Sequence, residues 1–96
     1  MSITIEHTAT VGAPSGLHAR PAAALAEAAA AAAARGFQVT IAKDGGPALD
    51  AGSILSLMTL GAKQGDVVTI SVTGEDVDQA AETADHIIDL IESEED

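Results

Sequence analysis

The sequence predicts an α+β fold in which an antiparallel sheet is covered by helices on one side. Its 96 residues suit one small domain, and an apolar content of 47% argues for a packed core. Segments with strand and helix periodicity follow one another in the order β-α-β-β-α-β-α, and a hairpin turn joins two of the strands. This mixed order with a hairpin favours an antiparallel sheet.

The N-terminal third of the chain predicts a strand followed by a helix. Apolar and polar residues alternate as in a half-buried strand, and the apolar side is formed by Ile3, Ile5, His7, Ala9 and Val11. On that side we expect His7 to be partly buried. An alanine-rich stretch then predicts a helix from about Ala19 to Ala34, which Gly36 ends. Because Leu25 is its only large apolar residue, this helix should pack shallowly on the sheet.

A hairpin is predicted after that helix. Phe37, Val39 and Ile41 alternate with polar residues as in a second strand, and Lys43-Asp44-Gly45-Gly46 supplies turn residues. A short third strand is predicted around Pro47 to Asp50. Because proline cannot donate a ladder hydrogen bond, this strand should be an edge strand or barely formed.

The second half of the chain predicts a short helix, a strand and a closing helix. Ser53 is placed as the N-cap of the short helix, which Gly61 ends. After a turn at Gly65-Asp66, the alternation of apolar and polar residues predicts a strand from Val67 to Thr73. The closing helix, about Val77 to Glu92, has acids opposite one apolar stripe, formed by Val77, Ala80, Ala81, Ala84, Ile87, Ile88 and Ile91. We treat residues 1–96 as one domain and expect residues 93–96 to be a frayed acidic tail.

The chain is strongly acidic, with 15 Asp and Glu against four Lys and Arg and a formal net charge of −11. This charge disfavours nucleic acid and anionic membrane surfaces as partners. The acids concentrate after Gly74, where they form either an ordinary solvated face or a halophilic adaptation to a high-salt cytoplasm that screens their repulsion. Unfolding midpoints from low to molar KCl separate the two, and a salt-independent midpoint counts against adaptation.

Other classes of protein are disfavoured by what the sequence lacks. It has no cysteine, no signal-peptide pattern and no apolar run long enough to cross a bilayer, so we expect a soluble cytoplasmic protein. His7, His18 and His86 lack the spacing of metal ligands, and we expect neither a metal nor a cofactor. A Ser-His-Asp constellation and a nucleotide-binding glycine loop are also missing.

The most informative segment is Gly16-Leu17-His18-Ala19-Arg20-Pro21-Ala22. It places an imidazole beside a guanidinium in the first turn of the predicted helix. There the backbone N–H groups of Ala19 and Arg20, with the positive end of the helix dipole, can hold a phosphoryl group carried by His18. The Arg20 side chain adds donors that match phosphate oxygens. The alternative from the residues alone is that His18 is a cap or a partly buried polar residue.

This segment resembles the active-site signature of the HPr family, the histidine-containing phosphocarriers of the phosphoenolpyruvate-dependent sugar phosphotransferase system. A second segment, Ser53-Ile54-Leu55-Ser56-Leu57-Met58-Thr59-Leu60-Gly61, is similar to the regulatory-serine helix of that family. The two stand at about the separation found in the family, so the resemblance covers nearly the whole domain. It implies an HPr-like open-faced sandwich in which three helices cover one face of a four-stranded antiparallel sheet.

The resemblance also implies a function. HPr accepts a phosphoryl group from phosphorylated enzyme I on Nδ1 of its active-site histidine, which matches His18, and passes it to enzyme IIA components during sugar uptake. Arg20 matches the arginine that contacts the phosphoryl group. Such a protein is a phosphoryl carrier rather than an enzyme with its own substrate pocket, and we expect it to be a monomer.

The matching regulatory serine is Ser53, and its role stays open. In some bacteria an HPr kinase phosphorylates this serine with ATP, whereas in others the serine only caps the helix. Gly52 stands where many relatives have a lysine, and we favour the capping role. The resemblance further implies that Ile54, Leu55 and Met58 dock enzyme I and enzyme IIA, with burial in the core as the alternative.

Two other functions share this fold. A regulatory HPr-like module would act through Ser53 and the residues after it without carrying phosphate. A carrier could instead serve a dihydroxyacetone kinase or a nitrogen-related phosphorelay. The presence of both His18 and Arg20 favours a carrier, because a pure regulator needs no nucleophile.

Overall fold

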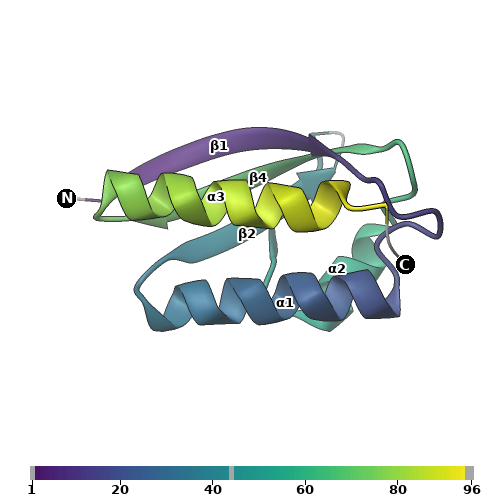
Figure 1. Cartoon of the computed structure of the whole chain (residues 1–96), viewed down its shortest axis with the longest axis horizontal. Helices are drawn as coiled ribbons and strands as arrows, with labels where there is room; N and C mark the ends of the chain where they lie inside the picture. Colours follow the sequence, from purple (N-terminus) through teal and green to yellow (C-terminus); the bar gives the residue numbers. More distant parts are fainter. Residues whose placement is uncertain (1, 44, 95–96) are drawn as a thin grey trace.

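The computed structural model describes residues 2–43 and 45–94. Its elements follow the predicted order: β1 (Ile3–Thr10), α1 (Ala19–Ala34), β2 (Gln38–Lys43), β3 (Leu49–Asp50), α2 (Ile54–Leu60), β4 (Val67–Gly74) and α3 (Val77–Glu92). In Figure 1, α1 and α3 run side by side in front of the sheet, and α2 lies at the end where α1 begins. The predicted α+β class is therefore confirmed.

The four strands form one antiparallel sheet in the order β1-β4-β2-β3. Strand β1 pairs with β4 along its whole length, from Ile3 opposite Gly74 to Thr10 opposite Val67. Strand β3 pairs through only two residues, Leu49 and Asp50, and lies at the edge of the sheet, as predicted for a strand that follows a proline. The long strands thus carry the sheet, and β3 only links it to α2.

The core lies between the sheet and the helices. Helix α3 packs on β1 and β4, while α1 packs on β2 and against both other helices. As predicted, Leu25 is the one large side chain that α1 buries, and its other buried residues are alanines. Such small side chains let the helix lie close to its neighbours. Opposite them the sheet contributes larger residues, including Val39, Ile41, Val68, Ile70 and Val72.

Two predictions about burial are wrong. His7 is exposed rather than partly buried, because β1 is an edge strand and has a neighbouring strand on one side only. The second concerns the apolar stripe predicted for the closing helix. Val77 belongs to that stripe but is 57% exposed because it begins α3, whereas Thr83 lies outside the predicted stripe and is buried. The Thr83 hydroxyl tolerates burial because it donates to the Gln79 carbonyl at 2.8 Å.

The acidic residues lie at the surface. In the C-terminal segment each described acid is exposed, namely Glu75, Asp76, Asp78, Glu82, Asp85, Asp89, Glu92 and Glu94. This matches a solvated face, and adaptation to high salt stays a prediction. Asp44 of the predicted turn and the end of the predicted frayed tail, residues 95–96, lie outside the described residues. Among the helices of residues 2–43 and 45–94, none is both long and apolar enough to cross a membrane.

Candidate phosphorylation site

His18 stands at the N-terminus of α1. It is the N-cap residue, with extended backbone (φ −93°, ψ −165°), and its carbonyl accepts a hydrogen bond from the Ala22 N–H at 2.8 Å. Its side chain makes no capping hydrogen bond and is only partly buried. The imidazole therefore does not cap the helix, which was one alternative to a reactive role, whereas its partial burial fits the other.

The first turn of α1 is suited to an anion. N–H groups at the start of a helix point out of its N-terminal end, where the dipole is positive. Here those groups belong to Ala19 and Arg20, because Pro21 has no N–H and Ala22 donates to the His18 carbonyl. No acidic residue occupies this turn, although the chain carries a net charge of −11. A negative group on the imidazole would meet donors and no carboxylate in this turn.

The loop that leads to His18 is held by its backbone. Gly16 adopts φ +75°, and a Cβ there would collide with the Ala62 carbonyl. Only glycine fits this close approach. The next residue, Leu17, is buried, and its N–H donates to the same Ala62 carbonyl at 3.0 Å. His18 is thus fixed from both sides, by the helix after it and by this contact before it.

Residues that the sequence analysis did not single out complete the support of the loop. The Gln64 side chain donates to the Gly12 carbonyl at 3.1 Å, and the Gly12 N–H donates to the Ile91 carbonyl at 3.0 Å. The Thr10 N–H donates to the Glu92 carboxylate at 3.1 Å. These contacts join residues at least 50 positions apart in the chain, so no local pattern could have indicated them.

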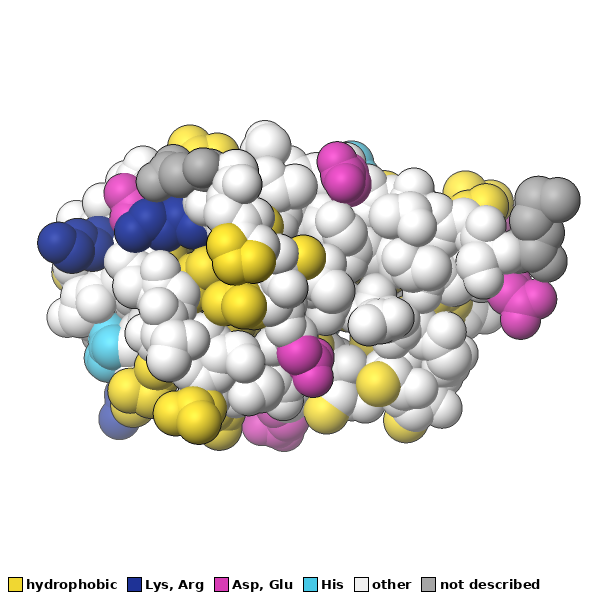
Figure 2. Space-filling view, turned by 180° about the vertical axis from the view of Figure 1, so that it is seen from behind, with side chains coloured by type: hydrophobic (Ala, Val, Ile, Leu, Met, Phe, Trp, Pro, Cys, Tyr) yellow, Lys and Arg dark blue, Asp and Glu magenta, His cyan; other side chains and the backbone are white. Residues whose placement is uncertain are grey.

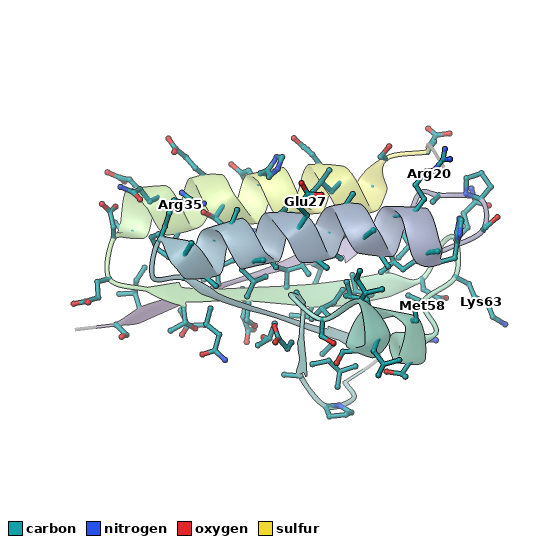
Figure 3. The ribbon with its side chains drawn as sticks, turned by 90° about the horizontal axis from the view of Figure 1, so that it is seen from below. Arg20, Glu27, Arg35, Met58 and Lys63 are labelled. Atoms are coloured by element: carbon teal, nitrogen blue, oxygen red, sulfur yellow. The ribbon has the colours of Figure 1, made fainter. Side chains whose placement is uncertain are left out.

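The few basic residues of the chain gather near this site. Figure 3 places Arg20 and Lys63 at the end of the molecule where α1 begins, with Arg35 at the other end. Lys43 belongs to the same end as Lys63, because its Nζ donates to the Gly61 carbonyl at 3.1 Å. The dark blue side chains visible in Figure 2 lie at one end of the face shown, where a cyan and several yellow side chains also lie. Three of the four Lys and Arg therefore mark the end that holds the site.

Asp66 is an acid within this basic region. Its pKa is lowered from the ordinary value of 3.8, chiefly because its carboxylate accepts a hydrogen bond from the Lys63 backbone N–H. Burial opposes this lowering as the second-largest effect, and the Lys43 side chain lowers the pKa further. The Lys43 Nζ lies 3.4 Å from Asp66 Oδ2. Asp66 is therefore held in its ionised form.

An apolar patch lies beside the site on α2. We define it as Ile54, Leu55 and Met58, whose exposed fractions are 45%, 74% and 50%. These values rule out burial of the three residues in the core. A helix of seven residues buries one face, and Leu57 occupies it. Because α2 packs against α1 and Met58 lies at the same end as Arg20 (Figure 3), a partner that covers the patch would also reach His18.

Ser53 caps α2, as predicted. Its Oγ accepts a hydrogen bond from the Ser56 N–H at 3.2 Å, and Gly61 ends the helix with φ +69°. Gly52, which precedes the cap, donates its N–H to the Asp50 carboxylate at 2.8 Å. The capping role is thus visible in the structure, and regulatory phosphorylation of Ser53 stays a prediction.

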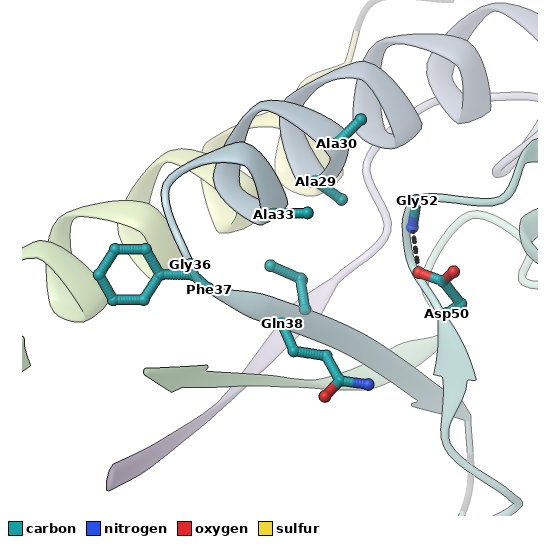
Figure 4. A pocket seen from close by; sticks show the side chains of 9 residues that line it. Ala29, Ala30, Ala33, Gly36, Phe37, Gln38, Asp50 and Gly52 are labelled. Carbon is teal, nitrogen blue, oxygen red and sulfur yellow. Dashed lines mark hydrogen bonds between the residues drawn. The ribbon is translucent and has the colours of Figure 1, made fainter. Parts of the chain in front are cut away.

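A shallow groove of about 570 Å³ lies away from the site, between the second half of α1 and the start of β2 (Figure 4). Its lining is mostly small or apolar and comprises Ala29, Ala30, Ala33, Gly36, Phe37, Gln38, Val39, Asp50 and Gly52. The lining holds one carboxylate and no histidine, lysine or arginine. The groove therefore shares no residue with the candidate site around His18.

Known proteins with related sequences and structures carry phosphoryl groups. The family described as "PTS HPr component phosphorylation site" matches residues 5–93. A phosphocarrier protein HPr of Streptomyces coelicolor is 39% identical over 77 residues, which are 80% of this chain and 80% of that protein. The crystal structure of a phosphocarrier protein HPr from Bacillus anthracis is similar with a TM-score of 0.76 and 29% identity, and the match covers 92% of this chain and 96% of that one.

A longer relative contains a similar segment. A multiphosphoryl transfer protein of Xanthomonas campestris is 38% identical over 87 residues, which are 90% of this chain. The chain spans only about a tenth of the length of that protein, the aligned share being 10%. Together with the fold, these matches define a phosphocarrier domain of the phosphotransferase system. The chain belongs to the HPr family.

Proposed function

We propose that His18 accepts a phosphoryl group from phosphorylated enzyme I on Nδ1 and passes it to enzyme IIA components for sugar uptake. The observation that carries this proposal is the position of His18 as the N-cap of α1, with a side chain that does not cap the helix. In this role the protein is a carrier that is consumed and regenerated, with a phosphohistidine intermediate and no substrate pocket of its own.

The transfer is a displacement at phosphorus. The lone pair of Nδ1 forms a bond to phosphorus while the bond between phosphorus and its carrier atom on enzyme I breaks, so the phosphoryl group moves as one unit. Its negative charge then faces the first-turn N–H groups of α1 and the Arg20 guanidinium. The backbone donors belong to the first turn of α1, so they require no reorganisation at the moment of transfer. The same step in reverse, with enzyme IIA as acceptor, regenerates the imidazole.

The apolar patch and the basic residues support docking of both partners at one end of the molecule. Ile54, Leu55 and Met58 offer apolar contact area next to His18. This end also holds Arg20, Lys43 and Lys63, three of the four Lys and Arg of the chain. They lie near the carboxylates of Asp66 and Glu92, and such surface charges orient an approaching protein more than they add affinity. We infer that partners approach along this end.

The decisive experiment locates the phosphate. The protein is incubated with phosphoenolpyruvate and enzyme I, and the acid-labile phosphate is mapped by mass spectrometry. We expect it on His18, and His18→Ala should abolish it. His86→Ala is the matched control, because His86 is an exposed histidine on α3 and its loss should leave phosphorylation unchanged. Phosphate that persists in His18→Ala would refute the proposal.

Arg20 has its own test. Arg20→Ala should slow transfer about tenfold or more, since the lost donor acts on the developing charge. Arg20→Lys should restore part of the rate, because lysine keeps the charge and loses the planar fork of donors. Arg35→Ala is the control, since it removes the arginine at the opposite end of α1 (Figure 3). Equal transfer rates in Arg20→Ala and the wild type would exclude this role for Arg20.

The docking surface is tested with a charge on the apolar patch. Leu55→Asp should raise the KM of enzyme I for this protein as its phosphoryl acceptor. It should leave stability nearly unchanged, because the side chain is 74% exposed. Val77→Asp provides the control, since Val77 is also an exposed apolar residue but begins α3, at the other end of the molecule (Figure 1). An unchanged KM in Leu55→Asp would remove the patch from the docking surface.

A further inference from the structure

The segment between α2 and β4, residues 61–66, is hydrogen-bonded to the loop that leads to His18, residues 11–17. Four hydrogen bonds of 2.9 to 3.1 Å join the two segments. They run from Leu17 N–H to the Ala62 carbonyl, from the Gln64 side chain to the Gly12 carbonyl, from Gly65 N–H to the Val11 carbonyl and from Val11 N–H to the Asp66 carbonyl. Any displacement of residues 61–66 is therefore transmitted to the loop.

One carboxylate organises this segment. Asp66 Oδ2 accepts a hydrogen bond from the Lys63 N–H at 2.8 Å, and the Asp66 N–H donates to the Lys63 carbonyl at 2.9 Å. The same oxygen lies 3.4 Å from the Lys43 Nζ, which also donates to the Gly61 carbonyl at 3.1 Å. We call this set of contacts, made by Lys43 and Asp66 with residues 61 and 63, the Lys43–Asp66 brace.

The brace surrounds the acceptor on which the loop depends. Ala62 lies between the two residues that the brace holds, Gly61 and Lys63, and its carbonyl accepts the Leu17 N–H. At Gly16 the loop has no room to move inward, since a Cβ there would come within 3.0 Å of the Lys63 Cα. The place of His18 relative to the first turn of α1 therefore depends on where Ala62 is held.

We propose that Asp66, supported by Lys43, is a positioning residue for phosphoryl transfer. It acts through Ala62 and Leu17 and touches neither His18 nor the phosphoryl group. The inference rests on the proposed carrier function, which it deepens by naming the group that sets the geometry of the imidazole. Nothing in the active-site segment itself points to this residue.

Magnitudes favour a role in geometry over a role in stability. An ion pair this exposed, with about a quarter to a third of each side chain accessible (27% and 33%), contributes little to folding. In contrast, a misplacement of reacting groups by about 1 Å can slow a reaction about 100-fold. A small displacement of residues 61–66 should therefore lower the rate of phosphoryl transfer more than it lowers the free energy of unfolding.

The test separates hydrogen bonding from charge. Asp66→Ala removes the acceptor and should slow phosphorylation of His18 by enzyme I about tenfold. Asp66→Asn keeps an oxygen that can accept the Lys63 N–H and should stay within about threefold of the wild type. The phosphorylation rate of Lys43→Met should lie between those of Asp66→Ala and Asp66→Asn. Asp85→Ala, which removes an exposed acid of α3, is the matched control and should transfer at the wild-type rate.

A second measurement does not depend on transfer. Amide hydrogen exchange should become faster at Leu17 and Gly65 in Asp66→Ala, and stay slow at Phe37, whose N–H is bonded to the Ala32 carbonyl at the far end of α1. Wild-type transfer by Asp66→Ala, or unchanged exchange at Leu17, would overturn the inference. If the wild-type protein itself gained no phosphate on His18, the proposed function would fail, and exchange at Leu17 would still decide whether the brace holds the loop.

Discussion

The two ends of α1 each carry an arginine and lie next to a glycine with positive φ, but they are built in different ways. At the C-terminal end Arg35 donates to the Thr83 hydroxyl at 3.2 Å, and its guanidinium lies 5.7 Å from the centre of the Phe37 ring. That ring packs so closely on Gly74 that a Cβ there would collide with it. At the N-terminal end the close contacts are between backbones, with Gly16 against the Ala62 carbonyl.

This difference separates stability from function along one helix. The C-terminal end joins α1, β2 and α3 through side chains, as a core does. The N-terminal end is positioned by backbone hydrogen bonds. The positions of His18 and Arg20 in the fold therefore do not depend on which side chains these residues carry. The 16 residues of α1 span about 24 Å at 1.5 Å per residue, so changes at one end should leave the other end intact.

The largest expected effect is at the C-terminal end. Phe37→Ala should lower the free energy of unfolding by about 3–5 kcal/mol, because it removes a buried ring and leaves a cavity beside Gly74. Urea unfolding measures this loss, and Phe37→Leu should show a smaller one. The transfer rate per folded molecule should not change. A slower transfer in the folded fraction would break the separation of the two ends.

A pair of glycines sharpens the comparison. Gly36 has φ +91° and open space around it, whereas Gly16 has φ +75° and faces the Ala62 carbonyl. Gly36→Ala should therefore cost only the strain of a left-handed residue, about 1–2 kcal/mol. Gly16→Ala adds a steric clash and should cost more, with slower phosphoryl transfer as well. Equal unfolding free energies for the two variants would show that the Ala62 contact is dispensable.

A smaller effect is expected at Thr83. Thr83→Val keeps the shape of the side chain but removes the hydroxyl that accepts from Arg35 and donates to Gln79. The loss should be about 1 kcal/mol in the free energy of unfolding, measured by urea denaturation. Transfer should stay at the wild-type rate, and Thr83→Ser, which restores the hydroxyl, should recover part of the stability. Full stability in Thr83→Val would mean that this hydroxyl contributes nothing.

The smallest effect concerns pH and the N-terminal end. The pKa of Asp66 is lowered from 3.8 in the folded protein, mainly by the Lys63 N–H. The stabilisation by its carboxylate is therefore complete at pH values above the pKa that Asp66 has in the unfolded chain. This contribution is lost as the pH falls through the lower, folded pKa. Free energies of unfolding should therefore differ between wild type and Asp66→Asn at neutral pH and converge in acid. A constant difference at every pH would contradict the assignment.

The order of elements and the reactive segment were predictable because local patterns determine them. Alanine content and the stop at Gly36 predicted helix α1 with its observed bounds. Ser53 caps α2, as its position before an apolar run predicted. His7 was misplaced because alternation reports the side of a strand and not whether the strand lies at an edge. The support of the loop by Gln64 and Asp66 was missed because it joins segments far apart in the chain.

By itself the sequence determined which elements form and that an imidazole precedes a helix beside an arginine, because capping, turn residues and periodicity act over a few neighbouring positions. Only the tertiary structure decided that the apolar residues of α2 face solvent, that basic residues gather at one end and that residues 61–66 hold the loop before His18. These features depend on which distant segments meet when the core closes, and no local pattern of residues encodes that.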